Sequence, residues 1–369
     1  MNYLAPVLID INLFYMRIPK FSNISHSFYN ELKKRTSAYF EEVGKSTTGN
    51  YSLFIKAVIL MLGVTFLYVH LVFFTPSVIW AILESALMGC FVAAIGFNVM
   101  HDGAHGSFSK YRWVNFLAAF SLNILGGNSF MWNMKHNIIH HAYTNIDGID
   151  DDIDIQPWMR MSRTQKKYKL HKYQHLYFWF LYSLLYIFWV FLLDYTKYFR
   201  NKVGSMPLKK MNIMDHIVFW SFKLVHAFVF VGLPIYLLGF NAWLIGFIIF
   251  SSVAGFVLSI VFQLAHTVEH TSFPVPIQDT GKMDDEWAIH QIKTTANFAT
   301  KNKLVSWLVG GLNFQIEHHL FPKISHIHYP AISKIVKQTC QEYGLVYIEY
   351  PRVHLAVASH VAFLRQMGR

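Results

Sequence analysis

Long apolar runs alternate with polar segments along most of this 369-residue chain. Four runs exceed the roughly 18 residues that a membrane-crossing helix needs, and they fall into two pairs. Residues 57–75 and 77–100 are separated only by Pro76, and residues 216–238 and 242–265 only by a turn at residues 239–241. Two apolar helices joined by so short a turn must run antiparallel. The pattern therefore predicts two transmembrane hairpins.

Two further apolar runs are ambiguous. Residues 114–125 are too short to cross a bilayer. Residues 176–193 are long enough, but they are rich in Tyr and Trp, which favour the membrane–water interface. If the histidine clusters described below form one site, an even number of crossings must separate them. Neither run can then cross, so we expect both in the interface. An amphipathic pattern over residues 27–42 predicts a further helix on a surface.

The composition supports a membrane protein. Hydrophobic residues make up 54% of the chain and charged residues only 14%, against about 25% charged in soluble domains. This excludes a disordered chain, a coiled coil and an ordinary soluble globule. Two cysteines, Cys90 and Cys340, are too few for a disulfide scaffold or a cysteine-rich metal site.

The positive charges indicate an orientation. Of the 32 Lys and Arg residues, only Lys56 and Lys223 lie in or at the edge of a predicted span. The others gather on one side, which the positive-inside rule assigns to the cytoplasm together with both termini. The predicted fold class is an all-α polytopic membrane protein with four spans, interfacial helices and a cytoplasmic cap. We divide it into an N-terminal segment 1–50, a membrane unit 51–345 and a C-terminal tail 346–369, and expect no nucleic-acid partner.

The chain contains 20 histidines, and many of them form three dense clusters. The clusters are HDGAH at 101–105, HNIIHH at 136–141 and QIEHH at 315–319, and His266 follows the last span. On a helix, residues i and i+4 lie on one face, so two such imidazoles can bind one metal ion. Adjacent histidines point about 100° apart, so one cluster can serve two metals.

Eight imidazoles then supply about four ligands per metal and leave positions open. The proposed set is His101, His105, His136, His140, His141, His266, His318 and His319. Such all-nitrogen ligation suits non-haem iron, zinc or copper. Two other pairs share the same spacing: we read His171 and His175 as structural, and leave open whether His270, four residues after His266, is a further ligand. A metal transporter or a transmembrane b-haem protein would need ligands within the spans, and only His70 and His226 lie well inside them.

The three clusters resemble the histidine boxes of the integral-membrane fatty-acid desaturases, and the resemblance covers about residues 50–345. Gln315, where many relatives have histidine, resembles the front-end branch, which places a new double bond between an existing one and the carboxyl end. The segments HHAYTNIDGIDDDID and FQLAH are similar to bacterial acyl-CoA or linoleoyl-CoA desaturase-like members. The chain contains no His-Pro-Gly-Gly motif of a fused cytochrome b5 domain.

The resemblance implies a fold, a reaction and partners. Two iron ions, dioxygen and electrons from a separate ferredoxin or cytochrome b5 would insert a cis double bond into an acyl-CoA or acyl-lipid. The eight histidines would hold the irons, and Gln315 would be a weak ligand or orient a metal-bound water. The implied location is the bacterial inner membrane, with the site facing the cytoplasm. A hydroxylase of the same superfamily is the alternative.

Several neighbouring residues are candidates for supporting roles. Carboxylates near the boxes are expected to bind the outer N–H groups of the histidines; the candidates are Asp102, Asp147, Asp150, Asp151, Glu269 and Glu317. Trp132 and Trp158 are candidates to line an apolar tunnel for the acyl chain.

Overall fold

The computed structural model describes residues 18–22, 27–277 and 279–369, which are mostly helical. The first half contains α1 (Phe28–Val43), α2 (Tyr51–Val69), η1 (His70–Phe74), α3 (Val78–Ile95), η2 (Gly96–Met100), α4 (His101–His105), α5 (Arg112–Ile124), α6 (Ser129–Asn133), η3 (Met134–His140), α7 (His141–Tyr143), η4 (Lys169–Tyr173), α8 (Gln174–Ser183), α9 (Leu185–Phe188), η5 (Trp189–Leu193) and α10 (Asp194–Arg200). The second half contains β1 (Lys202–Val203), β2 (Met206–Pro207), α11 (Ile213–Ala227), η6 (Phe228–Gly232), α12 (Leu233–Leu238), α13 (Phe240–His266), α14 (Trp287–Thr294), β3 (Asn297–Phe298), α15 (Lys303–Leu308), α16 (Gln315–Leu320), η7 (His326–His328), α17 (Tyr329–Glu342), β4 (Glu349–Tyr350) and α18 (Val353–Gly368).

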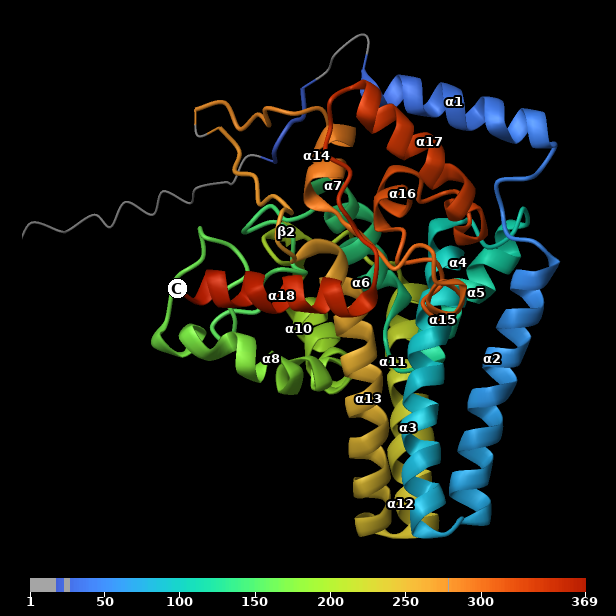
Figure 1. Ribbon diagram of the computed structural model, residues 1–369. Coiled ribbons are helices and arrows are strands. Elements are labelled where there is room, and N and C mark those ends of the chain that lie inside the picture. Colours follow the sequence, from blue (N-terminus) through green and yellow to red (C-terminus); the bar gives the residue numbers. More distant parts are fainter. Residues whose placement is uncertain (1–17, 23–26, 278) are drawn as a thin grey trace, which may run out of the picture.

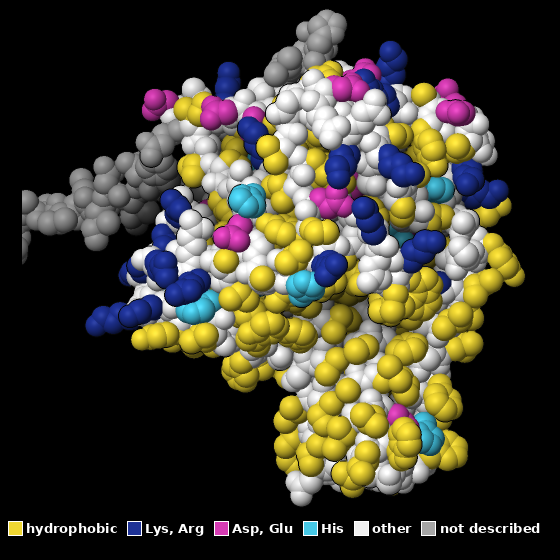
Figure 2. All heavy atoms as spheres, viewed as in Figure 1, with side chains coloured by type: hydrophobic (Ala, Val, Ile, Leu, Met, Phe, Trp, Pro, Cys, Tyr) yellow, Lys and Arg dark blue, Asp and Glu magenta, His cyan; other side chains and the backbone are white. Residues whose placement is uncertain are grey.

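Four continuous helices in the described residues are long and apolar enough to cross a membrane. They are Tyr51–Phe74, Val78–His105, Ile213–Leu238 and Phe240–His266. They stand side by side as two hairpins (Figure 1), and their surface is covered with hydrophobic side chains, whereas Lys and Arg gather on the part above them (Figure 2). The prediction of an all-α polytopic membrane protein is confirmed. The helices extend past the predicted spans: the second continues through the first histidine cluster.

The turns of the two hairpins follow from a few residues. Thr75 has φ 45° and is followed by Pro76, which cannot continue the helix. Gly239, with φ 80°, makes the other turn between α12 and α13. The polar ends of these helices lie at the opposite end of the bundle, where the rest of the chain forms a cap (Figure 1).

The ambiguous run 176–193 does not form a straight span. The helices Lys169–Ser183 and Leu185–Arg200 meet at an angle of 58°, and α8 lies beside the bundle, below α18 (Figure 1). A buried ion pair joins the second arm to a span, with Lys223 Nζ 2.9 Å from Asp194 Oδ2. The same ammonium donates to the carbonyls of Gly126 and Val190. The charge at position 223 is thus paired within the protein.

The cap packs its own hydrophobic layer above the histidines. Helix α1 occupies the residues expected for a surface helix and lies on the side of the cap away from the hairpin turns (Figure 1). Its buried Phe28 and Leu32 pack with Ile332 and Val336 of α17. At the C-terminal end, α18 packs beside α8 through Leu364 and its neighbours. Helices α1 and α18, which lie near the two ends of the described chain, therefore both pack into the cap around the histidines.

Candidate metal centre

The first histidine cluster lies on the last turn of a continuous helix. Helix α3 passes through the π-helix η2 into α4, which ends at Gly106 with φ 74°, the left-handed conformation that favours glycine at a helix end. His101 and His105 stand one turn apart with ring centroids separated by 4.7 Å. The span itself therefore carries both imidazoles to the edge of the cap.

The second cluster lies in a π-helix. Asn128 caps α6 by accepting a hydrogen bond from the Met131 backbone N–H, and the helix widens over Met134–His140. Because a π-helix closes its hydrogen bonds over five residues rather than four, neighbouring side chains are separated by a smaller angle than in an α-helix. His140 and His141 thus both remain on the side of His136, and His141 Nε2 lies 3.2 Å from His136 Nε2. The angle of about 100° predicted from the sequence for adjacent histidines applies to an α-helix.

The third cluster and His266 complete the group. His318 and His319 lie on the short helix α16 and are buried. The His318 ring lies 4.4 Å from that of His101, and the His319 ring lies 4.8 Å from that of His266, the last residue of α13. Elements more than 200 residues apart thus meet at one place.

The nitrogen atoms form two sets. The first set contains His101, His105, His136 and His318, and the second contains His140, His266 and His319, with the atoms of each set within 4.8 Å of one another. Two further groups join these sets: His141, which also contacts His136, with His318 and His319, and His136 with His140 and Asp152. All eight predicted histidines are brought together.

The inward-facing nitrogens fit a metal. A buried Nε2 atom has no hydrogen-bond partner within the described chain in five histidines: His105, His140, His266, His318 and His319. Nε2 of His101 and of His141 each lie 3.2 Å from Nε2 of His136. A buried polar atom without a partner costs free energy, and two metal ions bound here would satisfy these lone pairs.

The titration of the cluster supports the same conclusion. Burial lowers the pKa of His136, His141, His318 and His319 well below the usual histidine range, and the neighbouring imidazoles lower it further. Neutral imidazole is the form that binds metals. His140 differs: burial alone would lower its pKa, but the carboxylates of Asp150 and Asp152 raise it above the usual value.

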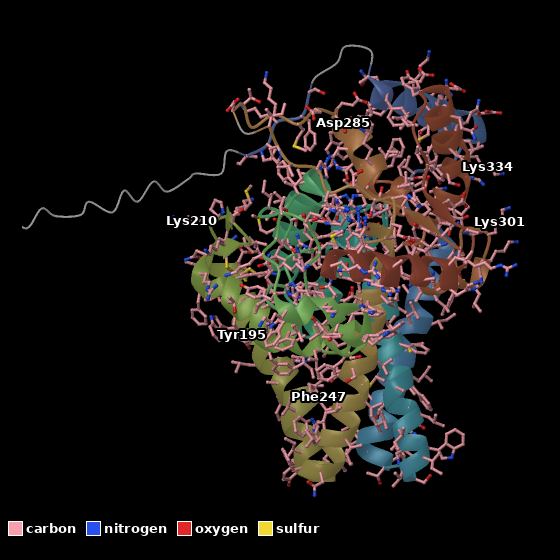
Figure 3. All side chains as sticks on the ribbon, turned by 60° about the vertical axis from the view of Figure 1, so that its left-hand side comes forward. Tyr195, Lys210, Phe247, Asp285, Lys301 and Lys334 are labelled. Carbon is pink, nitrogen blue, oxygen red and sulfur yellow. The ribbon has the colours of Figure 1, made fainter. Side chains whose placement is uncertain are left out.

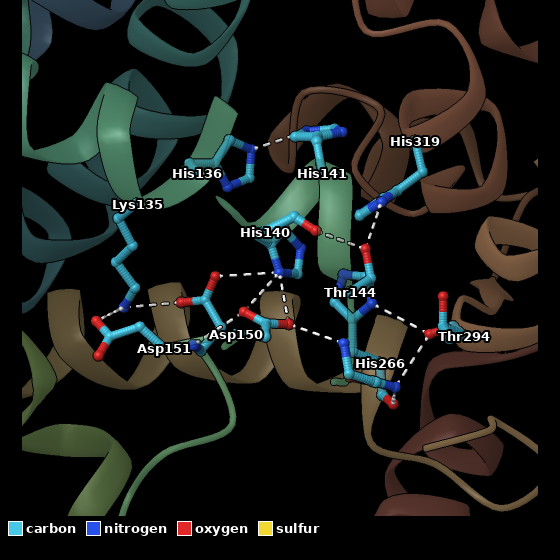
Figure 4. A network of polar contacts seen from close by, with 12 residues as sticks. Lys135, His136, His140, His141, Thr144, Asp150, Asp151, His266, Thr294 and His319 are labelled. Atoms are coloured by element: carbon cyan, nitrogen blue, oxygen red, sulfur yellow. Dashed lines mark hydrogen bonds and ion pairs between the residues drawn. The ribbon is translucent and has the colours of Figure 1, made fainter. Parts of the chain in front are cut away.

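Outer partners hold several of the rings. His140 Nδ1 lies 3.1 Å from Asp150 Oδ2 and 3.3 Å from Asp152 Oδ2, and Figure 4 shows this group beside His266 and His319. His319 Nδ1–H donates to Gln291 Oε1 at 2.8 Å. The His266 Nδ1 atom lies 3.3 Å from the Thr294 carbonyl oxygen, and the His318 Nδ1 atom lies 3.1 Å from Tyr329 Oη.

These contacts test the carboxylates singled out from the sequence. Asp150 has the expected role. Asp102 Oδ1 lies 4.0 Å from His101 Nδ1, and its other oxygen accepts from Ser325 and His326. It therefore joins the first box to the loop after the third.

The remaining four carboxylates contact other groups. Asp147 binds Thr164 and Gln165, and Asp151 pairs with Lys135 and Lys197. Glu317 accepts from Asn297 and Tyr347, while only the backbone of Glu269 bonds to Ser359 and Tyr350. Expecting these four to support the histidines was wrong. The partners that replace them, Gln291 and Tyr329, carry no motif that the sequence could have revealed.

Gln315 begins the helix that bears the third box. It is buried, and its Oε1 atom has no hydrogen-bond partner among the described residues. Residues i+3 and i+4 both share a helix face with residue i, so Gln315 lies on the side of α16 that carries His318 of the first set and His319 of the second. Its role as a ligand stays a prediction.

The other paired histidines lie apart from these sets. His171 is buried and its Nε2 atom bonds the Pro157 carbonyl, while His270 is exposed. His70 pairs with Glu84 at 2.8 Å inside the first hairpin, and His226 stacks on Phe230. These four histidines belong to none of the metal-binding groups found among the described residues.

An apolar cavity of about 410 Å³ adjoins the histidines. His101, His136 and Trp132 line one part of it, and Leu122 and Phe262 belong to its apolar walls. Charged and polar residues line another part, among them Lys135, Asp152, Asp154 and Lys197, together with the exposed Trp158. Both tryptophans expected at a tunnel therefore line this cavity. Its lining thus combines charged residues, apolar residues and two histidines of the first set.

A sequence model of the family described as "Fatty acid desaturase" matches residues 75–351. The chain belongs to the fatty acid desaturase family. The sn-1 linoleoyl-lipid 6-desaturase of Arthrospira platensis is 37% identical over 347 residues, covering 93% of this chain and 93% of that protein. The protein of the same name from Synechocystis is 38% identical and covers 93% of this chain and 96% of its own length. An acyl-lipid (8-3)-desaturase of Physcomitrium patens is 34% identical over 93% of this chain and 72% of that protein. This desaturase is thus an oxidoreductase of lipid metabolism.

Proposed function

We propose that this desaturase uses two iron ions, dioxygen and external electrons to insert a cis double bond into the acyl chain of a membrane lipid, between an existing double bond and the carboxyl end. One observation carries the proposal: eight histidines converge, with their Nε2 atoms unpaired or facing one another, beside an apolar cavity. The names of the relatives support an acyl-lipid rather than an acyl-CoA, and Gln315 supports the front-end position.

The protein's own residues would bind the metals and align the substrate. Iron supplies the strong oxidant that removal of hydrogen from an unactivated methylene needs. We assign the first set of histidines to one ion and the second set to the other, with His141 between them and Gln315 completing the second set. Trp132 stacks on His136 with ring centroids 4.4 Å apart. Trp132 therefore forms a wall of the cavity beside His136, where the reacting methylene of the acyl chain would lie.

The decisive experiment expresses the protein in a host that is fed defined unsaturated acids. New double bonds are located by mass spectrometry in each lipid class, with the His319→Ala variant as the inactive control. We expect a new double bond on the carboxyl side of an existing one, in intact lipids. A bond on the methyl side would contradict the regiochemistry, and a hydroxylated product would contradict desaturation itself.

A separate electron donor is part of the proposal. We infer that a ferredoxin or cytochrome b5 docks on the cap, where Lys301 and Lys334 lie on the outer surface (Figure 3). Because an acidic donor would be steered by these charges, turnover should fall as salt is raised. Undiminished turnover at high salt, or turnover without any added carrier, would contradict this docking.

The orientation in the bilayer is proposed in the same way. Both termini and the metal centre would face the cytoplasm, in the inner membrane of a bacterium. Reporter tags at residues 76, 205 and 240 should then read outside, inside and outside. A tag at 205 that reads outside would mean that the bent helix crosses the membrane.

A further inference from the structure

A second apolar cavity lies between the two hairpins, in the half of the bundle remote from the histidines. Its volume is about 500 Å³. All four spans line it, with Val72, Ala81, Met88, Phe230, Pro234 and Phe247 among the contributing residues. Phe247 lies low in the bundle, well away from the cap residue Asp285 (Figure 3). No charged side chain is among the described residues that line this cavity.

Its two large polar aromatic side chains are already satisfied. Tyr68 donates its hydroxyl proton to the Val229 carbonyl at 2.6 Å, and Trp243 Nε1–H donates to the Phe230 carbonyl at 2.9 Å. A buried water needs two to four polar partners, and cavities with apolar walls stay dry. An empty space of this size forfeits packing contacts throughout its lining. A hydrocarbon chain in this cavity would restore the lost packing contacts without needing polar partners.

This second cavity is closed off from the cavity at the histidines. No described residue lines both. Between them, α3 and α13 touch at Gly89, where a Cβ atom would lie 2.5 Å from the Phe250 carbonyl oxygen and 3.0 Å from the Ala254 nitrogen. On another side the Tyr186 ring packs 5.2 Å from the Phe250 ring, and its hydroxyl bonds the Leu125 carbonyl. An acyl chain in the first cavity therefore meets a wall before it reaches the second.

The second cavity opens instead toward the outside of the bundle. Val78, Leu237 and Ile245 line it and are also 75%, 43% and 58% exposed. These residues belong to the ends of the spans that lie away from the cap, so in a bilayer they face the acyl chains of the remote leaflet. A lipid tail can enter here without meeting a charged group among the described lining residues.

We propose that the second cavity binds one acyl chain of a bilayer lipid from the leaflet remote from the histidine cap. The bound chain fills the space between the hairpins and so stabilises their packing. This site is separate from the one at which desaturation is proposed, and its test does not depend on that activity.

Gly246 offers a matched pair of variants. A Cβ atom at this position would contact only Ser85 Oγ, at the ordinary distance of 3.4 Å, so the helix accepts a side chain that grows into the cavity. Gly246→Leu would occupy part of the space that the lipid needs. Gly246→Ala supplies the same gain in helix propensity while leaving the cavity almost unchanged.

The wild type and both variants are purified and exchanged into lipid-free detergent. Lipid that stays bound is counted by mass spectrometry, and Tm is measured with and without added dioleoylphosphatidylethanolamine. A ligand raises Tm only if it binds the folded protein. We expect the wild type and Gly246→Ala to retain lipid and to gain Tm on its addition. For Gly246→Leu we expect the retained lipid and the Tm gain each to be at least about twofold smaller, because the leucine side chain fills the site.

Two results would overturn the proposal. Equal lipid retention and an equal Tm gain in Gly246→Leu and Gly246→Ala would show that no lipid occupies the cavity. A changed preference for acyl-chain length in desaturation by Gly246→Leu would show that the substrate reaches it. If Gly246→Leu does not fold, Ala81→Phe fills the same space from α3 and is measured in the same way.

Discussion

The two histidine sets are held in place by different means. In the second set, each ring has an outer partner: a carboxylate pair for His140, an amide for His319 and a backbone carbonyl for His266. In the first set, within the described chain, only His318 has such a bond, to Tyr329. His136 instead faces its neighbours, with Nε2 atoms 3.2 Å apart. Hydrogen bonds orient the second set, whereas helix geometry and packing orient the first.

This contrast has a chemical consequence. A carboxylate on the outer nitrogen raises the basicity of an imidazole ligand and fixes its tautomer. An iron ion held by the second set would therefore receive more electron density than one held by the first. The two proposed metal positions would therefore differ in their surroundings.

The largest effect is expected from removing a ligand. His140→Ala or His319→Ala should abolish desaturation and lower iron content, while the apolar spans keep the fold. The loss of desaturation rate should exceed the about 10- to 100-fold loss that follows removal of an outer hydrogen-bond partner. Iron per chain and product formation are measured together, with His270→Ala as the control, because His270 is exposed and outside both sets. Full activity in either variant would contradict the assignment of that histidine as a metal ligand.

Asp150→Asn tests the charge that supports the second set. The change keeps the size of the side chain but removes the negative charge 3.1 Å from His140. Activity should fall about 10- to 100-fold, measured as initial rate per bound iron. Asp147→Asn is the matched control, since Asp147 bonds only Thr164 and Gln165 among the described contacts. Equal losses in both variants would point to general damage of the loop.

Gln315 tests whether the second set, with three histidines, is completed by an amide. The Gln315→Ala, Gln315→His and Gln315→Glu variants should each lower turnover, by about tenfold. Gln315→His should keep its iron, because imidazole is the stronger ligand, but it should lose turnover, because that ligand would fill the position that dioxygen needs. Gln315→Glu adds a charge and should shift the reduction potential. Near wild-type turnover in all three would leave the residue without a role at the metal.

The smallest effect is expected in the first set, from Tyr329→Phe. It removes one neutral hydrogen bond to His318, which corresponds to about a two- to tenfold loss of rate. Tyr350→Phe, which loses bonds to Glu269 and Ser359 instead, should leave the rate unchanged. A loss in Tyr329→Phe as large as in Asp150→Asn would remove the difference between the two sets.

The sequence by itself determined the spans, the boxes and the family. Hydropathy over about 20 residues is a local property that no tertiary contact needs to establish. The i, i+4 spacing of His101 and His105 likewise fixes two ligands on one helix face. The parity argument predicts that residues 176–193 lie in the interface; the structure shows a helix pair bent by 58° there, and the interfacial placement stays a prediction.

Only the tertiary structure decided how the histidines divide and what supports them. The widening of the helix at residues 134–140 depends on packing, and it moved His141 beside His136. Gln291 and Tyr329 reach their histidines from separate helices, so their positions follow from how α14, α16 and α17 pack rather than from any local period. Asp150 and Asp151 are adjacent in the chain, yet one binds His140 and the other binds lysines. A run of like residues cannot reveal this difference, because each side chain takes its role from what the fold places opposite it.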